Sequence, residues 1–161
     1  MGQVTKNKIA GYVVFDHDGT LVDTSAHPYE LFGGMKDFLT ELKNLGFVLY
    51  VWTARPRRST LEITKRLEIS QYFDEYFCFD DGLPKPHSEG LSKLCDGIDK
   101  NKILHIGDSL SDIDGAKAFG IEVVAACWGD LNLLDKFQPL ANYTASSLDE
   151  CRSIIKGKFH V

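Results

Sequence analysis

Short apolar runs alternate with segments of helical periodicity along most of this 161-residue chain, and this alternation constrains the fold more than any other feature. Buried strands are predicted where these runs are rich in β-branched or aromatic residues, at 9–15, 47–52, 76–79, 102–106 and 121–126. A short edge strand is predicted at 142–145. Strands that alternate with helices pair in parallel and carry helices on both faces of the sheet. The pattern therefore predicts an α/β fold, a Rossmann-like three-layer α/β/α sandwich with a mainly parallel sheet.

The intervening helices are predicted from apolar stripes and from capping residues. One stripe recurs at helical spacing and ends at Gly46; its members are Met35, Phe38, Leu39, Leu42 and Leu45. A helix that continues through Leu67 is predicted from a capping box at Ser59 and Glu62, and another that continues through Ile155 is predicted from a cap at Ser147 and Glu150. Three more helices are predicted around 91–98, over 109–119 before Gly120, and around 131–137. Because no repeat or linker divides the pattern, residues 1–161 are predicted to form one domain.

Charge and composition exclude several classes of protein. The formal net charge is −5 and no run of Lys or Arg is longer than two, so a general nucleic-acid or membrane-surface binder is not expected. No stretch has the length and apolar content of a signal peptide or a membrane span. The four cysteines form no C-x-x-C pair, which indicates buried thiols rather than a zinc or redox site. We expect a cytoplasmic protein without a membrane partner.

Polar residues follow the first four predicted strands. In a parallel α/β sheet, ligands bind beyond the carboxyl ends of the strands. These ends carry, in chain order, Asp16-His17-Asp18-Gly19-Thr20, Thr53-Ala54-Arg55, Lys85-Pro86 at a short distance, and Gly107-Asp108-Ser109 with Asp112. Acids, a hydroxyl group and a lysine at one edge of a sheet suit phosphoryl transfer, in which the protein mainly positions groups and neutralises charge.

The first pair of acids predicts a metal ion. Positions i and i+2 after a strand project to the same side, which brings Asp16 and Asp18 together. Such carboxylates repel each other unless a cation offsets their charge, and Mg²⁺ prefers hard oxygen ligands of this kind. Asp16 and Asp108, on neighbouring strands, are the expected ligands. One carboxylate can then attack phosphorus while the other carries a proton for the leaving oxygen.

The companion residues fit the same chemistry. Gly19 permits a tight turn and a close approach of the backbone to an anion. Lys85 can offset the charge of the phosphoryl group, and the Thr53 hydroxyl can hold a phosphate oxygen. Ser109 and Asp112 also fit a helix capping box, so a structural role is open for both.

Taken in order, these segments resemble the motifs of the haloacid dehalogenase superfamily of hydrolases. The matching stretches are residues 15–24 for the first motif, Thr53 for the second, Lys85-Pro86 for the third, and Gly107-Asp108-Ser109 with Asp112 and Gly115-Ala116 for the fourth. The similarity runs from residue 9 to residue 157, and residues 123–148 are similar to the end of phosphoglycolate-phosphatase-like members. The resemblance implies a Mg²⁺-dependent phosphomonoester phosphatase that forms an aspartyl-phosphate on Asp16.

The resemblance also implies a role for each matching residue. Asp16 would be the nucleophile and a metal ligand. Asp18 would be the general acid and later the general base, and its backbone carbonyl would bind the metal. The remaining roles would be phosphate binding by Thr53 and the Ala54 amide, stabilisation of the phosphoryl group by Lys85, Mg²⁺ binding by Asp108, and support of a metal-bound water or of Lys85 by Asp112.

Many members of that superfamily carry a cap domain over the site, and this chain departs from them. Only about ten residues separate Thr24 from the helix that begins near Gly34, which is too few for a domain. One helix, one strand and loops take up residues 57–84. The chain is therefore predicted to have no substantial cap domain. An uncapped site either accepts a bulky substrate or is closed by a second subunit, so a homo-oligomer is possible.

The sequence leaves the substrate open. A small-metabolite or sugar phosphate is favoured over a bulky substrate such as a phosphoprotein or a nucleic-acid end. A different class of function also stays open: a non-catalytic, phospho-accepting module that binds Mg²⁺ and signals through a phosphorylated aspartate, as receiver domains do.

Several arginines and aromatic residues near the expected site have less specific patterns. Arg55 either attracts an anionic substrate or is solvated, and solvation is favoured for Arg57 and Arg58. The aromatic residues within 72–79 are expected to pack in the core. Trp128 follows the last long strand and is a candidate for lining the site.

The histidines divide by their positions. His17 lies between the two acids, where it can shape contacts with the leaving group. His27 and His87 are expected at the surface, and His105, inside a predicted strand, is expected to be a hydrogen-bonded core residue.

Overall fold

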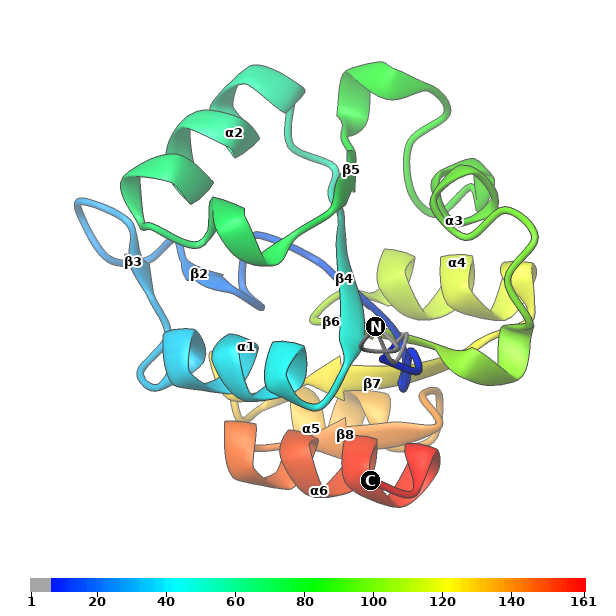
Figure 1. The fold of residues 1–161 in the computed structure, drawn as a ribbon. Coiled ribbons are helices and arrows are strands. Elements are labelled where there is room, and N and C mark those ends of the chain that lie inside the picture. Colours follow the sequence, from blue (N-terminus) through cyan, green and yellow to red (C-terminus); the bar gives the residue numbers. More distant parts are fainter. Residues whose placement is uncertain (1–6) are drawn as a thin grey trace, which may run out of the picture.

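A computed structural model describes residues 7–161, and its central feature is a six-stranded parallel sheet (Figure 1). The strands are β1 (Gly11–Phe15), β4 (Phe47–Trp52), β5 (Glu75–Phe77), β6 (Ile103–Gly107), β7 (Glu122–Ala126) and β8 (Tyr143–Ala145). Their order across the sheet is β5-β4-β1-β6-β7-β8, and every adjacent pair is parallel. Because β1 pairs with both β4 and β6, the residues that follow it lie at the middle of the carboxyl edge.

Helices cover both faces of this sheet and create two cores. The helices are α1 (Met35–Asn44), α2 (Arg57–Arg66), α3 (Glu89–Leu94), α4 (Leu110–Phe119), α5 (Leu133–Phe137) and α6 (Leu148–Phe159). On one face, Phe38 of α1 and Ile155 of α6 pack against the sheet. On the other, Leu91 of α3, Ile113 of α4 and Phe137 of α5 do so. Figure 1 shows α1 and α2 on one side and α3 and α4 on the other, which confirms the predicted three-layer α/β/α sandwich.

A small hairpin is the main addition to this core. Its strands β2 (Val22–Asp23) and β3 (Glu30–Leu31) are antiparallel and lie between β1 and α1 in the chain. Arg66 of α2 donates a hydrogen bond of 2.9 Å to the carbonyl oxygen of Tyr29, which ties the hairpin to that helix. The hairpin lies in the segment before α1 that the sequence analysis finds too short for a cap domain.

The single domain predicted for residues 1–161 stays a prediction, and its first six residues lie outside the described residues. Within residues 7–161, no helix combines the length and the apolar content that crossing a membrane requires.

The predicted capping box at Ser59 and Glu62 is wrong. The helix begins at Arg57, directly after Pro56, and no side chain of its own first residues caps it. The Arg57 amide instead donates to Asp80 at 2.8 Å, on the turn after β5. Ser59 donates back to the Pro56 carbonyl, and Glu62 pairs with Arg58. The cap thus comes from a distant segment, which local spacing does not reveal.

The other element boundaries differ by small amounts. The third strand of the sequence prediction ends at Phe77, because Phe79–Asp81 forms a 3₁₀ turn. The helix α3 ends at Leu94, before the last members of its predicted stripe, and α6 continues past Ile155 to Phe159. The predicted caps of α4 are confirmed. Ser109 accepts a hydrogen bond from the Asp112 amide, and Gly120 ends the helix in the left-handed region at φ 88°.

Candidate active site

Most of the residues predicted at the strand ends line one cavity of about 530 Å³. Its lining residues are Asp16, Asp18, Thr53, Ala54, Arg55, Pro56, Lys85, Asp108, Ser109 and Ser111. They follow β1, β4, β5 and β6, so the cavity lies at the carboxyl edge of the sheet. Gly19 and Asp112 do not line it, but each contacts a residue that does. The structure therefore brings all the predicted site residues together.

Asp16 lies in an acidic cluster at the base of the site. Its carboxylate and those of Asp108 and Asp112 offer oxygen atoms that all lie within 4.8 Å of one another. Burial, followed by repulsion from Asp112, raises the pKa of Asp16 well above its usual value, although Lys85 acts in the opposite direction. Burial also raises the pKa of Asp108. Without a further positive charge, ionised forms of these two groups are therefore unfavourable.

The turn after β1 fits closely against Asp108. Gly19 has φ 79°, and a Cβ atom built on it would lie 2.0 Å from Oδ2 of Asp108. The Thr20 hydroxyl donates to Oδ1 of Asp108 at 3.4 Å. Glycine is therefore required at position 19 both for the backbone conformation and for the approach of the carboxylate.

Asp16 and Asp108 together fit a magnesium site. Two carboxylates on neighbouring strands, close together and with raised pKa values, match the few hard oxygen ligands that Mg²⁺ takes from a protein. Asp112 belongs to the same cluster, but both of its oxygens already accept hydrogen bonds from Lys85, His105 and Ser109. Asp112 thus supports the site rather than offering a free ligand.

Lys85 is buried between two of these carboxylates. Its side chain is 3% exposed, and its Nζ atom lies 3.0 Å from Oδ1 of Asp16 and 2.5 Å from Oδ1 of Asp112. The ammonium group also lies 4.7 Å from the centroid of the Trp52 ring. Burial raises the pKa of Asp112, but Lys85 and His105 outweigh burial and leave that pKa below its usual range. Lys85 therefore faces an ionised Asp112.

His105 is buried in the core, as predicted, and it also contacts Asp112. Its Nδ1 atom lies 2.8 Å from the carbonyl oxygen of Val14 on β1, and its Nε2 atom lies 2.9 Å from Oδ1 of Asp112. Ser109 donates to the other oxygen of Asp112 from its amide, at 3.1 Å, and its hydroxyl, at 2.7 Å. Asp112 is thus fixed by the core on one side and by the start of α4 on the other.

Asp18 is held away from the acidic cluster by two positively polarised partners. Its carboxylate accepts hydrogen bonds from Arg55 through Nε at 2.9 Å and through Nη2 at 2.8 Å. The Nδ1 atom of His17 lies 2.6 Å from Oδ1 of Asp18. Burial raises the pKa of Asp18, but the hydrogen bonds with His17 and Arg55 outweigh burial and lower it to about 2. Metal binding by the Asp18 backbone carbonyl stays a prediction.

Two sequence interpretations of this pair need correction. His17 was expected to contact a leaving group, but it is fully buried and lines no part of the cavity. Its Nε2 atom has no hydrogen-bond partner within residues 7–161. Arg55 is not simply solvated, because it lines the cavity and pairs with Asp18. The spacing of Thr53 and Arg55 after a strand places both at the same edge of the sheet, but it does not indicate the pairing of Arg55 with Asp18.

Thr53 and Ala54 form another wall of the cavity. The Thr53 hydroxyl oxygen accepts a hydrogen bond of 3.0 Å from the Arg55 amide, so its hydroxyl hydrogen can be donated to a phosphate oxygen. The sequence interpretation did not assign Ser111 to the site. Its hydroxyl lies 2.8 Å from that of Ser109, and both residues line the cavity.

The remaining arginines and histidines lie outside the cavity. Arg57 donates to Asp81, and Arg58, which is exposed, donates to Glu62. His27 and His87 are exposed, as expected.

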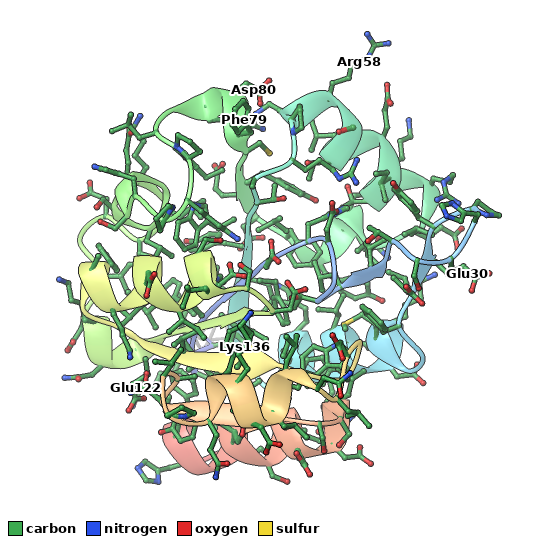
Figure 2. The ribbon with its side chains drawn as sticks, turned by 180° about the vertical axis from the view of Figure 1, so that it is seen from behind. Glu30, Arg58, Phe79, Asp80, Glu122 and Lys136 are labelled. Atoms are coloured by element: carbon green, nitrogen blue, oxygen red, sulfur yellow. The ribbon has the colours of Figure 1, made fainter. Side chains whose placement is uncertain are left out.

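The expectations for the aromatic residues are met only in part. Phe73 and Phe77 are buried, whereas Phe79, on the turn after β5 beside Asp80, is 51% exposed (Figure 2). Trp128 does not line the cavity with Asp16. It lines a different cavity, near Phe32 and Arg152, and its Nε1 atom donates to the carbonyl oxygen of Thr20 at 3.0 Å.

The chain is similar to known hydrolases in sequence. The model of the family described as haloacid dehalogenase-like hydrolase matches residues 26–126, more than half of the chain. A phosphoglycolate phosphatase of Haemophilus influenzae is 35% identical over 103 residues, which cover 62% of this chain and 46% of the relative. A probable phosphoglycolate phosphatase of Pseudomonas putida is 28% identical over 144 residues, covering 84% of this chain and 55% of the relative. The chain spans about half the length of these curated relatives.

Solved structures with little sequence identity share the fold. A protein described as a predicted phosphatase from Clostridium acetobutylicum superposes with a TM-score of 0.80 at 19% identity, covering 93% of this chain and 100% of that one. A putative phosphoglycolate phosphatase from Lactobacillus delbrueckii superposes with a TM-score of 0.69 at 23% identity, covering 79% and 54%. At these identities the likeness concerns the fold.

Proposed function

We propose, from the premise that this chain belongs to the haloacid dehalogenase-like hydrolase family, that it is a magnesium-dependent phosphatase of phosphomonoesters. The observation that carries the proposal is the contact between Lys85 and Asp16 beside Asp108, at the base of an open cavity. A carboxylate next to a buried cation and next to a second carboxylate suits attack on a phosphoryl group whose negative charge must be neutralised.

Asp16 and Asp18 have separate roles in the proposed reaction: Asp16 attacks phosphorus, and Asp18 transfers protons. In the first step, an oxygen of Asp16 attacks phosphorus, the bond to the leaving oxygen breaks, and Asp18 gives its proton to that oxygen. In the second step, Asp18 takes a proton from a water molecule, the water oxygen attacks phosphorus, and the bond to Asp16 breaks. Inorganic phosphate leaves and Asp16 returns to its starting form.

The other residues hold the phosphoryl group. Lys85 neutralises one of its oxygens, and the Thr53 hydroxyl and the Ala54 amide donate to others. Mg²⁺, when bound by Asp16 and Asp108, would supply further neutralisation of the charge on phosphoryl oxygens. His105 and Ser109 keep Asp112 in place, and Asp112 keeps Lys85 in place.

Asp18 is ionised in the conformation described, since its pKa is about 2. This form suits the second step, in which it accepts a proton from water. To donate a proton in the first step, it has to give up part of its contact with His17 or Arg55. We propose that a substrate entering beside Arg55 loosens the contact between Asp18 and these residues.

A small phosphorylated metabolite or sugar is the favoured substrate. Support comes from the curated relatives, whose names specify phosphoglycolate, a small molecule. A bulky substrate such as a phosphoprotein is the second candidate, because three exposed apolar side chains belong to segments that adjoin residues lining the cavity. Phe79, Leu83 and Leu110 are 51%, 52% and 46% exposed, on segments adjoining Arg55, Lys85 and Ser109. Closure of the site by a second copy of the chain stays a prediction.

The test is turnover of para-nitrophenyl phosphate with and without Mg²⁺. We expect hydrolysis that chelation of Mg²⁺ abolishes, that falls roughly 10²–10⁴-fold in Asp18→Asn, and that falls further in Asp16→Asn. Asp114→Asn is the control, since Asp114 is an exposed acid on the same helix as Asp112. A stable acyl phosphate without turnover would instead indicate a phospho-accepting module.

A comparison of substrates separates the two candidates. Phosphorylated metabolites, phosphopeptides and oligonucleotides with terminal phosphates would be assayed in parallel. If a phosphopeptide is the better substrate, Leu110→Ser should lower its kcat/KM while leaving that of para-nitrophenyl phosphate unchanged. A small metabolite with the highest kcat/KM supports the first candidate.

A further inference from the structure

Arg55 is a cationic residue of the cavity that has no role in binding the phosphoryl group in the proposed reaction. Among residues 7–161, two basic side chains line the cavity, and one of them, Lys85, is already paired with Asp16 and Asp112. The Arg55 guanidinium bonds to Asp18 through its Nε and Nη2 atoms. Because a guanidinium carries five N–H donors, those that do not bond to Asp18 can bind a second anion.

The structure around Arg55 fixes its position. Its amide donates to the Thr53 hydroxyl at 3.0 Å, and its carbonyl oxygen accepts from the Phe79 amide at 3.1 Å. The guanidinium lies 5.4 Å from the centroid of the Tyr29 ring, on the hairpin that follows β1. With only 19% of its side chain exposed, Arg55 is held between the sheet edge and this hairpin rather than extended into solvent.

The place of Arg55 in the proposed reaction is on the side of the leaving group. Asp18 can exchange a proton with the leaving oxygen only when the two atoms are within about 2.6–3.2 Å. Arg55 contacts the carboxylate that has to make this approach, so its guanidinium lies beside the leaving group. Thr53, Ala54 and Lys85 face the transferred phosphoryl group instead.

We propose that Arg55 binds an anionic group of the leaving group, so that the site selects phosphomonoesters that carry a carboxylate near the ester oxygen. This inference rests on the proposed function and adds a substrate class to it. A planar guanidinium matches a carboxylate through two parallel hydrogen bonds, which a lysine or a neutral side chain cannot form. A sugar or alkyl leaving group without negative charge gains nothing from this residue.

The test compares two substrates that differ in charge. For the wild-type enzyme with Mg²⁺, kcat/KM for 2-phosphoglycolate should exceed that for ethyl phosphate by roughly 10- to 100-fold, as expected for charge-assisted hydrogen bonds. In Arg55→Gln this ratio should fall to near one, chiefly through KM for 2-phosphoglycolate. In Arg55→Lys it should be intermediate. Any effect on Asp18 alone would lower kcat for both substrates and leave the ratio unchanged.

Arg58→Gln is the matched control, because Arg58 is 90% exposed and projects into solvent from the start of α2 (Figure 2). Its ratio should equal that of the wild type. A wild-type ratio near one, or a ratio preserved in Arg55→Gln, would overturn the proposal.

A binding experiment separates this proposal from the proposed function. Phosphonoacetate and ethylphosphonate are not phosphomonoesters, so their affinities can be measured by calorimetry whether or not the protein hydrolyses anything. We expect the wild type to prefer phosphonoacetate and Arg55→Gln to lose that preference. If neither phosphate ester is hydrolysed but this preference is found and depends on Arg55, the proposed activity fails and the role of Arg55 stands. Equal affinities in the wild type would overturn the role of Arg55.

Discussion

The Cβ position of Gly19 lies 2.0 Å from Oδ2 of Asp108, so the turns after β1 and β6 can meet only where residue 19 has no side chain. This relationship joins two segments that are far apart in the sequence. It also brings the carboxylate of Asp108 to the turn that carries Asp16 and Asp18.

Gly19→Ala should therefore damage the proposed metal site more than the fold. The left-handed backbone alone costs an alanine about 1–2 kcal/mol, and the added methyl group must also displace Asp108. We expect a large loss of Mg²⁺ affinity and of turnover. Calorimetric titration with Mg²⁺ and a thermal melt would measure the two effects. Gly97→Ala is the control, because Gly97 has φ 72° and open space around it; equal loss of Mg²⁺ affinity in both variants would contradict the prediction.

Asp16→Asn should stabilise the metal-free protein near neutral pH. Burial and Asp112 raise the pKa of Asp16, so the folded state binds its proton more tightly than the unfolded state. The contribution of this group to stability is thus full below the unfolded pKa of about 3.9 and is lost as the pH rises through the folded pKa.

Thermal melts in a chelator measure this effect. Asp16→Asn should melt above the wild type at pH 7, and the difference should shrink as the pH falls toward 4. Adding Mg²⁺ should raise the melting temperature of the wild type more than that of the variant. A variant that melts below the wild type at pH 7 without metal would be inconsistent with a raised pKa.

Lys85→Met should destabilise the protein strongly. It leaves Asp16 and Asp112 without their shared cation in a buried place, which costs about 3–5 kcal/mol. Urea unfolding would measure the loss. In a double-mutant cycle, Asp112→Asn should recover part of it, because one of the two charges is then gone. Lys93→Met is the matched control: Lys93 pairs with Glu89 at the surface, and its removal should cost less than about 1 kcal/mol.

His105→Phe should reduce turnover although His105 does not line the cavity. The variant leaves the Val14 carbonyl and one oxygen of Asp112 without their ring partner, at about 1–3 kcal/mol for each group. Asp112 then holds Lys85 less firmly, so kcat should fall while KM changes little. Steady-state kinetics alongside urea unfolding checks this. Unchanged kcat in a folded variant would show that the link from His105 to Lys85 has no effect on catalysis.

The sequence predicted the fold well because burial patterns repeat locally. The apolar runs of β1, β4, β6 and β7 could be recognised without knowing which strands pair with them, since strands buried on both faces are apolar throughout. The Ser109–Asp112 cap was also predictable, because both partners lie within one turn of a helix.

What the sequence could not predict depends on contacts between distant segments. Asp80 caps α2 from the turn after β5, so the local signal at Ser59 and Glu62 was misleading. The pairing of Arg55 with Asp18 joins residues 37 positions apart, and nothing in their spacing distinguishes a paired arginine from a solvated one. The convergence of Asp16, Lys85 and Asp112 was predictable only because parallel strands end at a common edge.

The central position of β1 places Asp16, the proposed nucleophile, at the end of a strand that is paired on both sides. The Asp16 amide itself donates to the Ile106 carbonyl at 2.9 Å, so this residue continues the hydrogen-bonded ladder between β1 and β6. Amides flanked by strands on both sides exchange with solvent only when the sheet comes apart. Asp16 should therefore keep its place as long as the sheet is intact. On warming, catalytic capacity should persist up to the cooperative melt and vanish with it.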